Sequence, residues 1–224
     1  MKDILRHQVW HLLFLLISIA AIQIFLTDKS ILVGELCGIS TKAWFWIAIA
    51  VPIIHQVYVL VIWRLELYHS TFAKRFGLSK AFKMYAIGFS ILFVSRLIFL
   101  TLLALSDRNS LSMNPLLAYS IIAVIIPLVA YLFYSVKKYF TMERAYGIDH
   151  FDKNYSEPFV KKGIFRYTNN GMYIFGLMVL YLPGLLFLSN TAIIVALFQH
   201  TYIWVHYYFT ERPDMRKIYG KMPQ

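Results

Sequence analysis

The sequence predicts an all-α polytopic membrane protein, a bundle of about six transmembrane helices with both termini on the cytoplasmic side. Three observations predict it. Hydrophobic residues make up 59% of the 224 residues and the mean hydropathy is +0.61, whereas only about half of a soluble domain is apolar. The apolar residues gather in separate runs, each long enough to cross the roughly 30 Å hydrocarbon layer. Basic residues lie mainly in alternate connections between these runs.

Six apolar runs define the expected helices. Open sheets are excluded because backbone groups in lipid must be paired within a segment, and no run alternates as a membrane barrel strand does. The fifth run barely reaches spanning length, and Pro183 and Gly184 inside it favour a bent or shortened helix. The runs cover residues 9–26, 43–63, 84–105, 116–136, 172–188 and 191–209.

The distribution of Lys and Arg orients these helices. The N-terminal stub, the loop 64–83, the stretch 137–166 and the C-terminal tail together hold 18 of the 22 basic residues. The alternate connections hold only Lys29, Lys42 and Arg108. Since cytoplasmic loops carry the excess of Lys and Arg, we expect both termini on the cytoplasmic side.

Charge and metal-ligand patterns exclude other classes of function. The net charge of +11 would suggest nucleic acid in a soluble chain, but here it is dispersed among loops that suit anionic headgroups, so no nucleic-acid partner is expected. A single cysteine, Cys37, excludes an internal disulfide. His200 and His206 are six residues apart, on different helix faces, so no metal is expected. Arg96 lies inside a run, where a charge needs a partner or a cavity, and Glu66 is one candidate.

The chain has no internal repeat and no long flexible linker, so we expect one membrane domain over residues 1–224. Residues 1–136 form a four-helix scaffold, and 137–165 form a cytoplasmic or interfacial loop rich in aromatic and basic residues. Residues 166–224 form a C-terminal helical hairpin. Because a hairpin returns the chain to its starting side, the polar segments before and after it are expected to meet there and form a site.

Those two segments read KKGIFRYTNNGMYIFG and HTYIWVHYYFTERPDMRKIYG. They resemble the C-terminal signature of the membrane phospholipid and isoprenylcysteine carboxyl methyltransferases, and the tail is most similar to phosphatidylethanolamine N-methyltransferases. Two positions depart from the family pattern: Asn170-Gly171 stands in place of His-Pro, and Arg212 stands in place of a second acidic residue. The matching residues are Gly163, Arg166, Tyr167, Tyr173, Gly176, Glu211, Tyr219 and Gly220.

The resemblance implies S-adenosylmethionine as methyl donor and a membrane lipid amine, the phosphatidylethanolamine headgroup, as acceptor. The chain lacks the glycine-rich strand-to-helix turn of soluble methyltransferases, so the donor would bind between helices. Glu211 would hold the donor ammonium, Arg166 or Arg212 would pair with its carboxylate, and Gly171 would permit close approach. The expected cofactor-binding residues are Arg166, Tyr167, Asn169, Asn170, Gly171, Met172, Tyr173, Glu211 and Arg212.

Methyl transfer is an in-line displacement in which positioning does most of the work. The acceptor amine must lose its proton, and His206 or Glu211 could accept it. Aromatic faces attract methylated cations. The expected catalytic residues are Glu211, His206 and Arg166, and the expected substrate-binding residues are Tyr207, Tyr208 and Tyr219.

Three alternatives stay open at this point. An isoprenylcysteine carboxyl methyltransferase would need a tunnel for the lipid tail and a cation for the carboxylate. A non-enzymatic small transporter or lipid-binding protein is the alternative from another class. A transporter would need polar residues at the midplane of several helices, or similar halves, and the runs offer little of that beyond Arg96 and His55. A nicotinamide-dependent lipid reductase would need a dinucleotide site. The expected location is a bacterial inner membrane or the endoplasmic reticulum, with the active site facing the cytoplasm. The oligomeric state, the number of methylations and the identity of the base stay open at this point.

Overall fold

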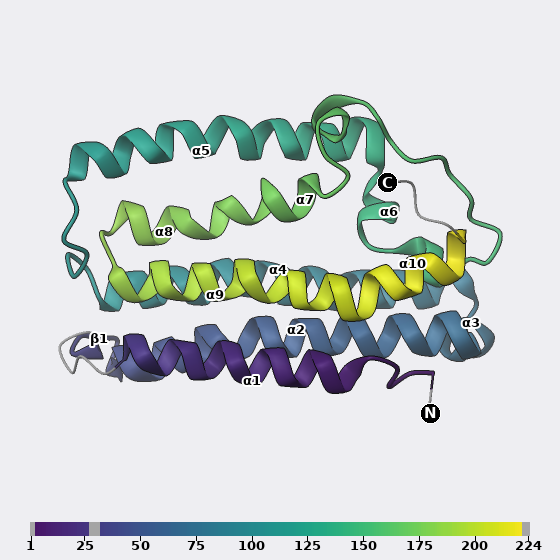
Figure 1. Ribbon diagram of the computed structural model, residues 1–224, viewed down its shortest axis with the longest axis horizontal. Helices are drawn as coiled ribbons and strands as arrows, with labels where there is room; N and C mark the ends of the chain where they lie inside the picture. Colours follow the sequence, from purple (N-terminus) through teal and green to yellow (C-terminus); the bar gives the residue numbers. More distant parts are fainter. Residues whose placement is uncertain (1–2, 27–31, 221–224) are drawn as a thin grey trace.

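The structure is a computed structural model that describes residues 3–26 and 32–220. Figure 1 shows a bundle in which the long helices run side by side along one axis. The prediction of an all-α fold is confirmed. Lys2, Lys29 and Lys221, which contribute to the charge count above, lie outside the described residues. The long helices are α1 (Gln8–Phe25), α2 (Thr41–His69), α4 (Leu78–Ser106), α5 (Pro115–Ser135) and α9 (Asn190–His206).

Within the described residues, four helices are long and apolar enough to cross a membrane, namely α1, α2, α4, and α5 with its π-helical continuation η2 (Val136–Phe140). They correspond to the first four predicted runs. The sixth run forms the 17-residue α9. The fifth run is broken into α7 (Gly171–Ile174), the 3₁₀ segment η5 (Gly176–Leu180) and α8 (Tyr181–Leu186). A count of six crossings therefore stays a prediction.

Polar side chains set several helix ends. The Ser40 hydroxyl accepts a hydrogen bond from the backbone N–H of Ala43 at the start of α2, and Asn114 caps α5 in the same way. Glu66, near the end of α2, accepts from the backbone N–H groups of Phe72 and Ala73 in α3 (Thr71–Phe76). This carboxylate is therefore used as a cap.

The candidate pairing of Arg96 with Glu66 is wrong. The Arg96 Nε atom instead donates to Gln199 Oε1 at 2.8 Å, which joins α4 to α9. Helix periodicity alone does not reveal which neighbouring helix a buried side chain faces, because that depends on how the helices are rotated in the bundle.

The core lies where α2, α4 and α9 meet. Its small members Ala48, Ala104, Ala192 and Ala196 are at most 1% exposed, and small residues let helices in a membrane approach closely. Many large apolar side chains remain on the outside of the bundle, as expected of helices that face lipid.

One end of the bundle carries the connections predicted to be short and weakly charged. A hairpin of β1 (Glu35–Leu36) and β2 (Ile39–Ser40) turns at Cys37 and Gly38, both with positive φ. At this end Asp107 Oδ2 accepts hydrogen bonds from the Ser110 and Ser189 hydroxyls. The same oxygen accepts from the Thr191 hydroxyl and backbone N–H, which fixes the end of α4 to the start of α9.

The other end gathers the polar segments (Figure 1). The start of α1 meets η6 there, because Gln8 Nε2 donates to the carbonyl of Phe209 at 3.1 Å. Which side of a membrane this end faces stays a prediction. Its short elements are α6 (Met142–Ala145), η3 (Ile148–His150), η4 (Gly163–Arg166), η6 (Tyr207–Glu211) and α10 (Arg212–Tyr219).

Candidate functional site

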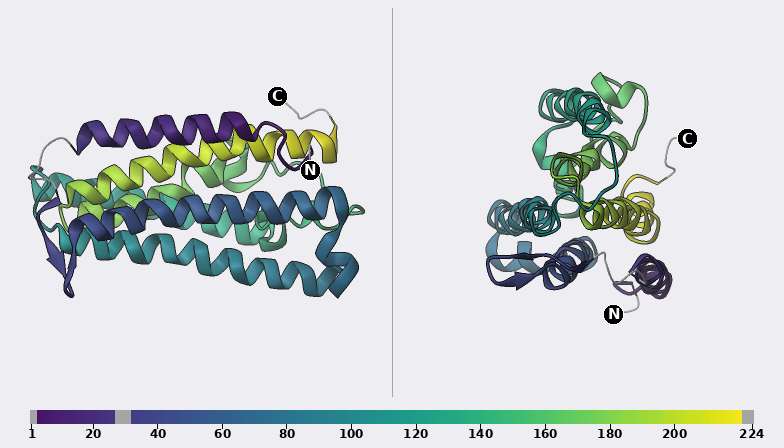
Figure 2. Two further views of the ribbon diagram at one scale, coloured as in Figure 1. Left: turned by 90° about the horizontal axis from the view of Figure 1, so that it is seen from below. Right: turned by 90° about the vertical axis from the view of Figure 1, so that its left-hand side faces the viewer.

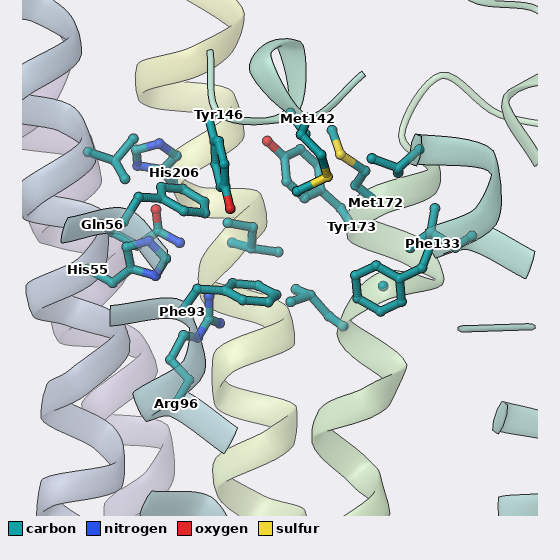
Figure 3. Close-up of a pocket in the computed structure, with 18 of the residues that line it drawn as sticks. His55, Gln56, Phe93, Arg96, Phe133, Met142, Tyr146, Met172, Tyr173 and His206 are labelled. Carbon is teal, nitrogen blue, oxygen red and sulfur yellow. The ribbon is translucent and has the colours of Figure 1, made fainter. Parts of the chain in front are cut away.

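A mostly apolar pocket, here the central pocket, opens between α2, α4, α5, α9 and the segments from α6 to η5. Figure 3 shows its labelled side chains converging from these elements. Aromatic, aliphatic and methionine side chains form most of the wall, and four polar side chains interrupt it. Those four are His55, Gln56, Arg96 and His206.

Tyr173 links this pocket to the C-terminal segment. Its hydroxyl donates to Glu211 Oε2, so the polar segments before and after the predicted hairpin do meet. The Tyr173 ring also contacts Tyr207 edge-on, with ring centroids 5.8 Å apart. The π-helical turn η6 positions Glu211, and such turns are frequent at functional sites.

Burial controls the protonation of Glu211. It raises the pKa of this carboxyl to about 7, against the hydrogen bond from Tyr173 and the nearby His150, both of which lower it. Asp149 and Asp214 add to the rise. A carboxyl that titrates near neutral pH can either hold a cation or accept a proton.

His206 ends α9 and lines the central pocket. It is 2% exposed, and its ring lies 6.0 Å from those of His11 and Trp63. Its Nδ1 atom has no hydrogen-bond partner among the described residues. The ring therefore keeps a free nitrogen inside the protein.

A buried charged cluster, here the Asp214 cluster, consists of Arg64, Asp149, His150, Asp214 and Tyr219. Arg64 Nε lies 3.2 Å from Asp214 Oδ2, and His150 Nε2 lies 4.0 Å from the same oxygen. His150 Nδ1 pairs with Asp149 Oδ1 at 3.0 Å, and the Tyr219 hydroxyl donates to Asp149 Oδ2 at 3.0 Å. The cluster thus ties α2, η3 and α10 together.

Burial acts on both acids of the Asp214 cluster, with opposite outcomes. It raises the pKa of Asp214, and Arg64 opposes this only in part. Burial would also raise the pKa of Asp149, but the hydrogen bonds from His150 and Tyr219 and the charges of His150 and Arg144 together lower it below its usual value. Asp149 is therefore held as an anion.

The structure separates the predicted cofactor-binding residues into two groups. Gly171 is buried and Met172 lines the central pocket beside Tyr173. In contrast, Arg166, Tyr167 and Asn169 are exposed, and the Arg166 side chain makes no hydrogen bond or ion pair with a described residue. Asn170 is partly exposed.

The remaining predicted residues lie around Glu211. Arg212 stacks over the Tyr208 ring at 5.7 Å, and Tyr208 itself is 49% exposed. Tyr207 reaches Tyr173 as described above. Tyr219 belongs to the Asp214 cluster and donates to Asp149.

Sequence reasoning missed the Asp214 cluster apart from Tyr219, and it did not place Arg96 and His55 in a pocket. Asp214 lies inside the recognised C-terminal motif, and Asp149-His150 is an acid–imidazole pair within the longest polar stretch. Both features of the sequence could have indicated a polar site. Among residues 3–26 and 32–220, no group of three or more His, Cys, Asp or Glu side chains could hold a metal ion.

Residues 113–222 match a family model described as phospholipid methyltransferase. The matched region starts just before α5 and includes Tyr173, His206 and Glu211 but neither His55 nor Arg96. No curated protein and no solved structure matches the chain.

Proposed function

Because residues 113–222 place this chain in the phospholipid methyltransferase family, we propose that it transfers a methyl group from S-adenosylmethionine to the amine of phosphatidylethanolamine. The family and the four apolar helices make the chain an integral membrane methyltransferase of the phospholipid or isoprenylcysteine type. The hydrogen bond between Tyr173 and Glu211 carries the finer proposal. It brings a carboxylate of the C-terminal motif to the wall of an apolar pocket.

The residues around Tyr173 suit the methyl donor. When bound, S-adenosylmethionine supplies an electrophilic methyl group on a sulfonium. Glu211 would provide the anion for the sulfonium and ammonium groups of the donor. Arg212 or Arg166 would pair with the carboxylate of the donor. A Cβ atom at Gly171 would lie 3.2 Å from the Ile164 side chain, so any larger residue here would require that side chain to shift.

The acceptor amine would lie deeper, in the central pocket. His206 is the proposed base because it lines this pocket and its Nδ1 atom has no hydrogen-bond partner in the described part of the chain. Desolvation in an apolar pocket also favours the neutral, nucleophilic form of an amine. The rings of Tyr146 and Phe93 offer faces that attract the methylated product.

We assign the end that carries Glu211 to the cytoplasmic side. The support is the excess of Lys and Arg in the connections at that end. The methyl donor would then reach the site from the cytosol, and the lipid would reach it from the bilayer. In this arrangement the segmented stretch from α7 to α8 and helix α9 form the fifth and sixth crossings.

The test uses purified protein in detergent with methyl-labelled S-adenosylmethionine and three acceptors: phosphatidylethanolamine, a prenylated cysteine, and a phosphatidylcholine blank. We expect label in phosphatidylethanolamine only. Glu211→Ala should abolish transfer, whereas Glu35→Ala, which removes an exposed carboxylate at the opposite end, should not.

Other outcomes would redirect or overturn the proposal. Label in the prenylated cysteine alone would select carboxyl methylation. Absence of donor binding by the wild-type protein would refute methyl transfer and favour a non-enzymatic lipid-binding protein.

A further inference from the structure

Arg96 is a buried cation for which the described chain provides no anion. It lies ten residues before the end of α4, which is about 15 Å along the helix and thus near the middle of the hydrocarbon layer. The side chain is 3% exposed. Its one hydrogen bond goes to the neutral amide of Gln199, and no ion pair between described residues includes it.

Part of the Arg96 guanidinium is left free for a ligand. The Nη2 atom is buried without a hydrogen-bond partner among the described residues. The side chain also lines the central pocket, and Figure 3 shows it pointing into that space. A charged side chain at this depth is costly unless it is paired and usually marks a substrate or ion pathway.

His55 gives a second, independent sign of a polar ligand. It is 2% exposed, and neither ring nitrogen has a hydrogen-bond partner among the described residues. Its ring instead packs edge-on against Phe89, with centroids 4.6 Å apart. The neighbouring Gln56 also lines the pocket and is 3% exposed. Buried polar groups are rarely left unpaired.

We propose that Arg96, His55 and Gln56 bind the phosphodiester of the acceptor lipid. This inference rests on the proposed function and names the group by which the substrate is recognised. A phosphodiester carries one negative charge, which one guanidinium neutralises, and its oxygens accept the further hydrogen bonds that imidazole and amide donors supply.

The order of side chains along the pocket agrees with the shape of an aminophospholipid. Figure 3 shows Arg96 at one end, His55 and Gln56 next, and His206 beyond them toward Tyr173. Two carbons separate the phosphate from the amine in the headgroup. A phosphate at Arg96 therefore directs the amine toward His206 and the Tyr173–Glu211 pair.

The acyl chains need an exit to the bilayer. Phe93 of α4 and Phe133 of α5 line the pocket, and Phe133 is 47% exposed on the outside of the bundle. The lipid tails would leave between these two helices. Arg96 is then a positioning residue for the lipid and not a group that takes part in the chemistry.

The test measures binding without methyl transfer. Calorimetry in a nonionic detergent would compare dihexanoyl-phosphatidylmethanol, a phosphodiester without an amine, with an uncharged dihexanoylglycerol methyl ether. Arg96→Gln should weaken phosphatidylmethanol binding at least tenfold and leave the uncharged lipid unchanged. The control Arg108→Gln, which changes an exposed arginine at the opposite end, should affect neither.

A second variant covers the case in which Arg96→Gln does not fold. His55→Phe keeps a ring of similar size but removes both nitrogens, and we expect about fivefold weaker phosphatidylmethanol binding. The proposal is overturned if wild-type protein does not bind phosphatidylmethanol, if the variants weaken both lipids equally, or if a dihexanoylglycerol hemisuccinate carboxylate binds more tightly. Since phosphatidylmethanol has no amine, Arg96-dependent binding without methylation of phosphatidylethanolamine would reject the proposed function and retain this site.

Discussion

The two ends of the bundle both bury acidic side chains, but they treat them differently. At the end with the β hairpin, one oxygen of Asp107 accepts four hydrogen bonds, from Ser110, Ser189 and Thr191. At the other end, Asp214 Oδ1 and His150 Nε2 have no hydrogen-bond partner among the described residues.

We interpret this difference as one between a structural polar group and a functional one. A buried acid whose partners all come from the chain locks two helices together, as Asp107 does for α4 and α9. A buried polar atom without a partner destabilises the fold, so its presence is better explained by a ligand or a reaction. The same contrast separates Glu66, which caps a helix, from Arg96, for which the described residues provide no anion.

The largest expected effect is on activity at the end that carries Glu211. Glu211→Gln should lower kcat/KM about 100-fold or more, because it removes the anion that we propose faces the cationic donor. The folded state should not suffer. Burial raises the Glu211 pKa from 4.5 to about 7, so the folded protein favours the protonated carboxyl. Its contribution to the free energy of unfolding is present below pH 4.5 and is lost as the pH rises through 7.

The measurement pairs initial rates with thermal unfolding at pH 8. A neutral amide should leave Tm equal to wild type or higher. A large fall in Tm that accounts for the lost activity would mean that Glu211 is structural, as Asp107 is.

The next largest effect is on stability at the opposite end. Asp107→Ala removes the shared acceptor of Ser189 and Thr191 and should lower the free energy of unfolding by about 3 kcal/mol. The kcat of the folded fraction should not change. Chemical unfolding in detergent, with rates normalised to folded protein, checks both. A loss of kcat in folded Asp107→Ala would break the distinction between the two ends.

A pH dependence should come from Glu211 and be absent from Asp107. In the proposed site only the ionised carboxylate would attract the donor cation, so donor affinity should rise between pH 6 and pH 8, by about tenfold for a pKa near 7. Donor titrations at several pH values measure this. Glu211→Gln should give a flat profile and Asp107→Ala a wild-type one, so a sloping profile in Glu211→Gln would assign the titration to another group.

The smallest effect is expected within the Asp214 cluster. Tyr219→Phe removes one hydrogen bond to Asp149 and should cost about 1 kcal/mol of stability, because His150 still pairs with this acid. The pKa of Asp149 should rise, since Tyr219 helps to lower it. NMR titration of a labelled carboxyl would detect the shift. An unchanged pKa would place Tyr219 outside the cluster in solution.

Hydropathy predicted the first four helices because a bilayer allows few other solutions for apolar runs of that length. The bend in the fifth run followed from Pro183, and the meeting of Tyr173 with Glu211 followed from the hairpin.

The Asp214 cluster was not predictable in this way. Arg64 and Asp214 are 150 residues apart, and a polar stretch containing Asp149-His150 has the composition of a solvated loop.

The partner of Arg96 was also beyond the reach of periodicity. Its contact with Gln199 depends on the rotation of α4 and α9 about their axes, which the apolar surface of α4 leaves undetermined because nearly all its faces are hydrophobic. The sequence predicted the location of polar residues that belong to a motif. It did not predict the location of polar residues whose partners depend only on three-dimensional packing.

Arg64 also binds segments that are made at different times during synthesis. Its Nη1 atom donates to the carbonyls of Ile4 and Arg6, and its Nε atom to Asp214. The segment before α1 and helix α10 therefore meet on one guanidinium. Because Asp214 is synthesised 150 residues after Arg64, we expect this cation to stay without its acid, and the Asp214 cluster to remain incomplete, until α10 has been made.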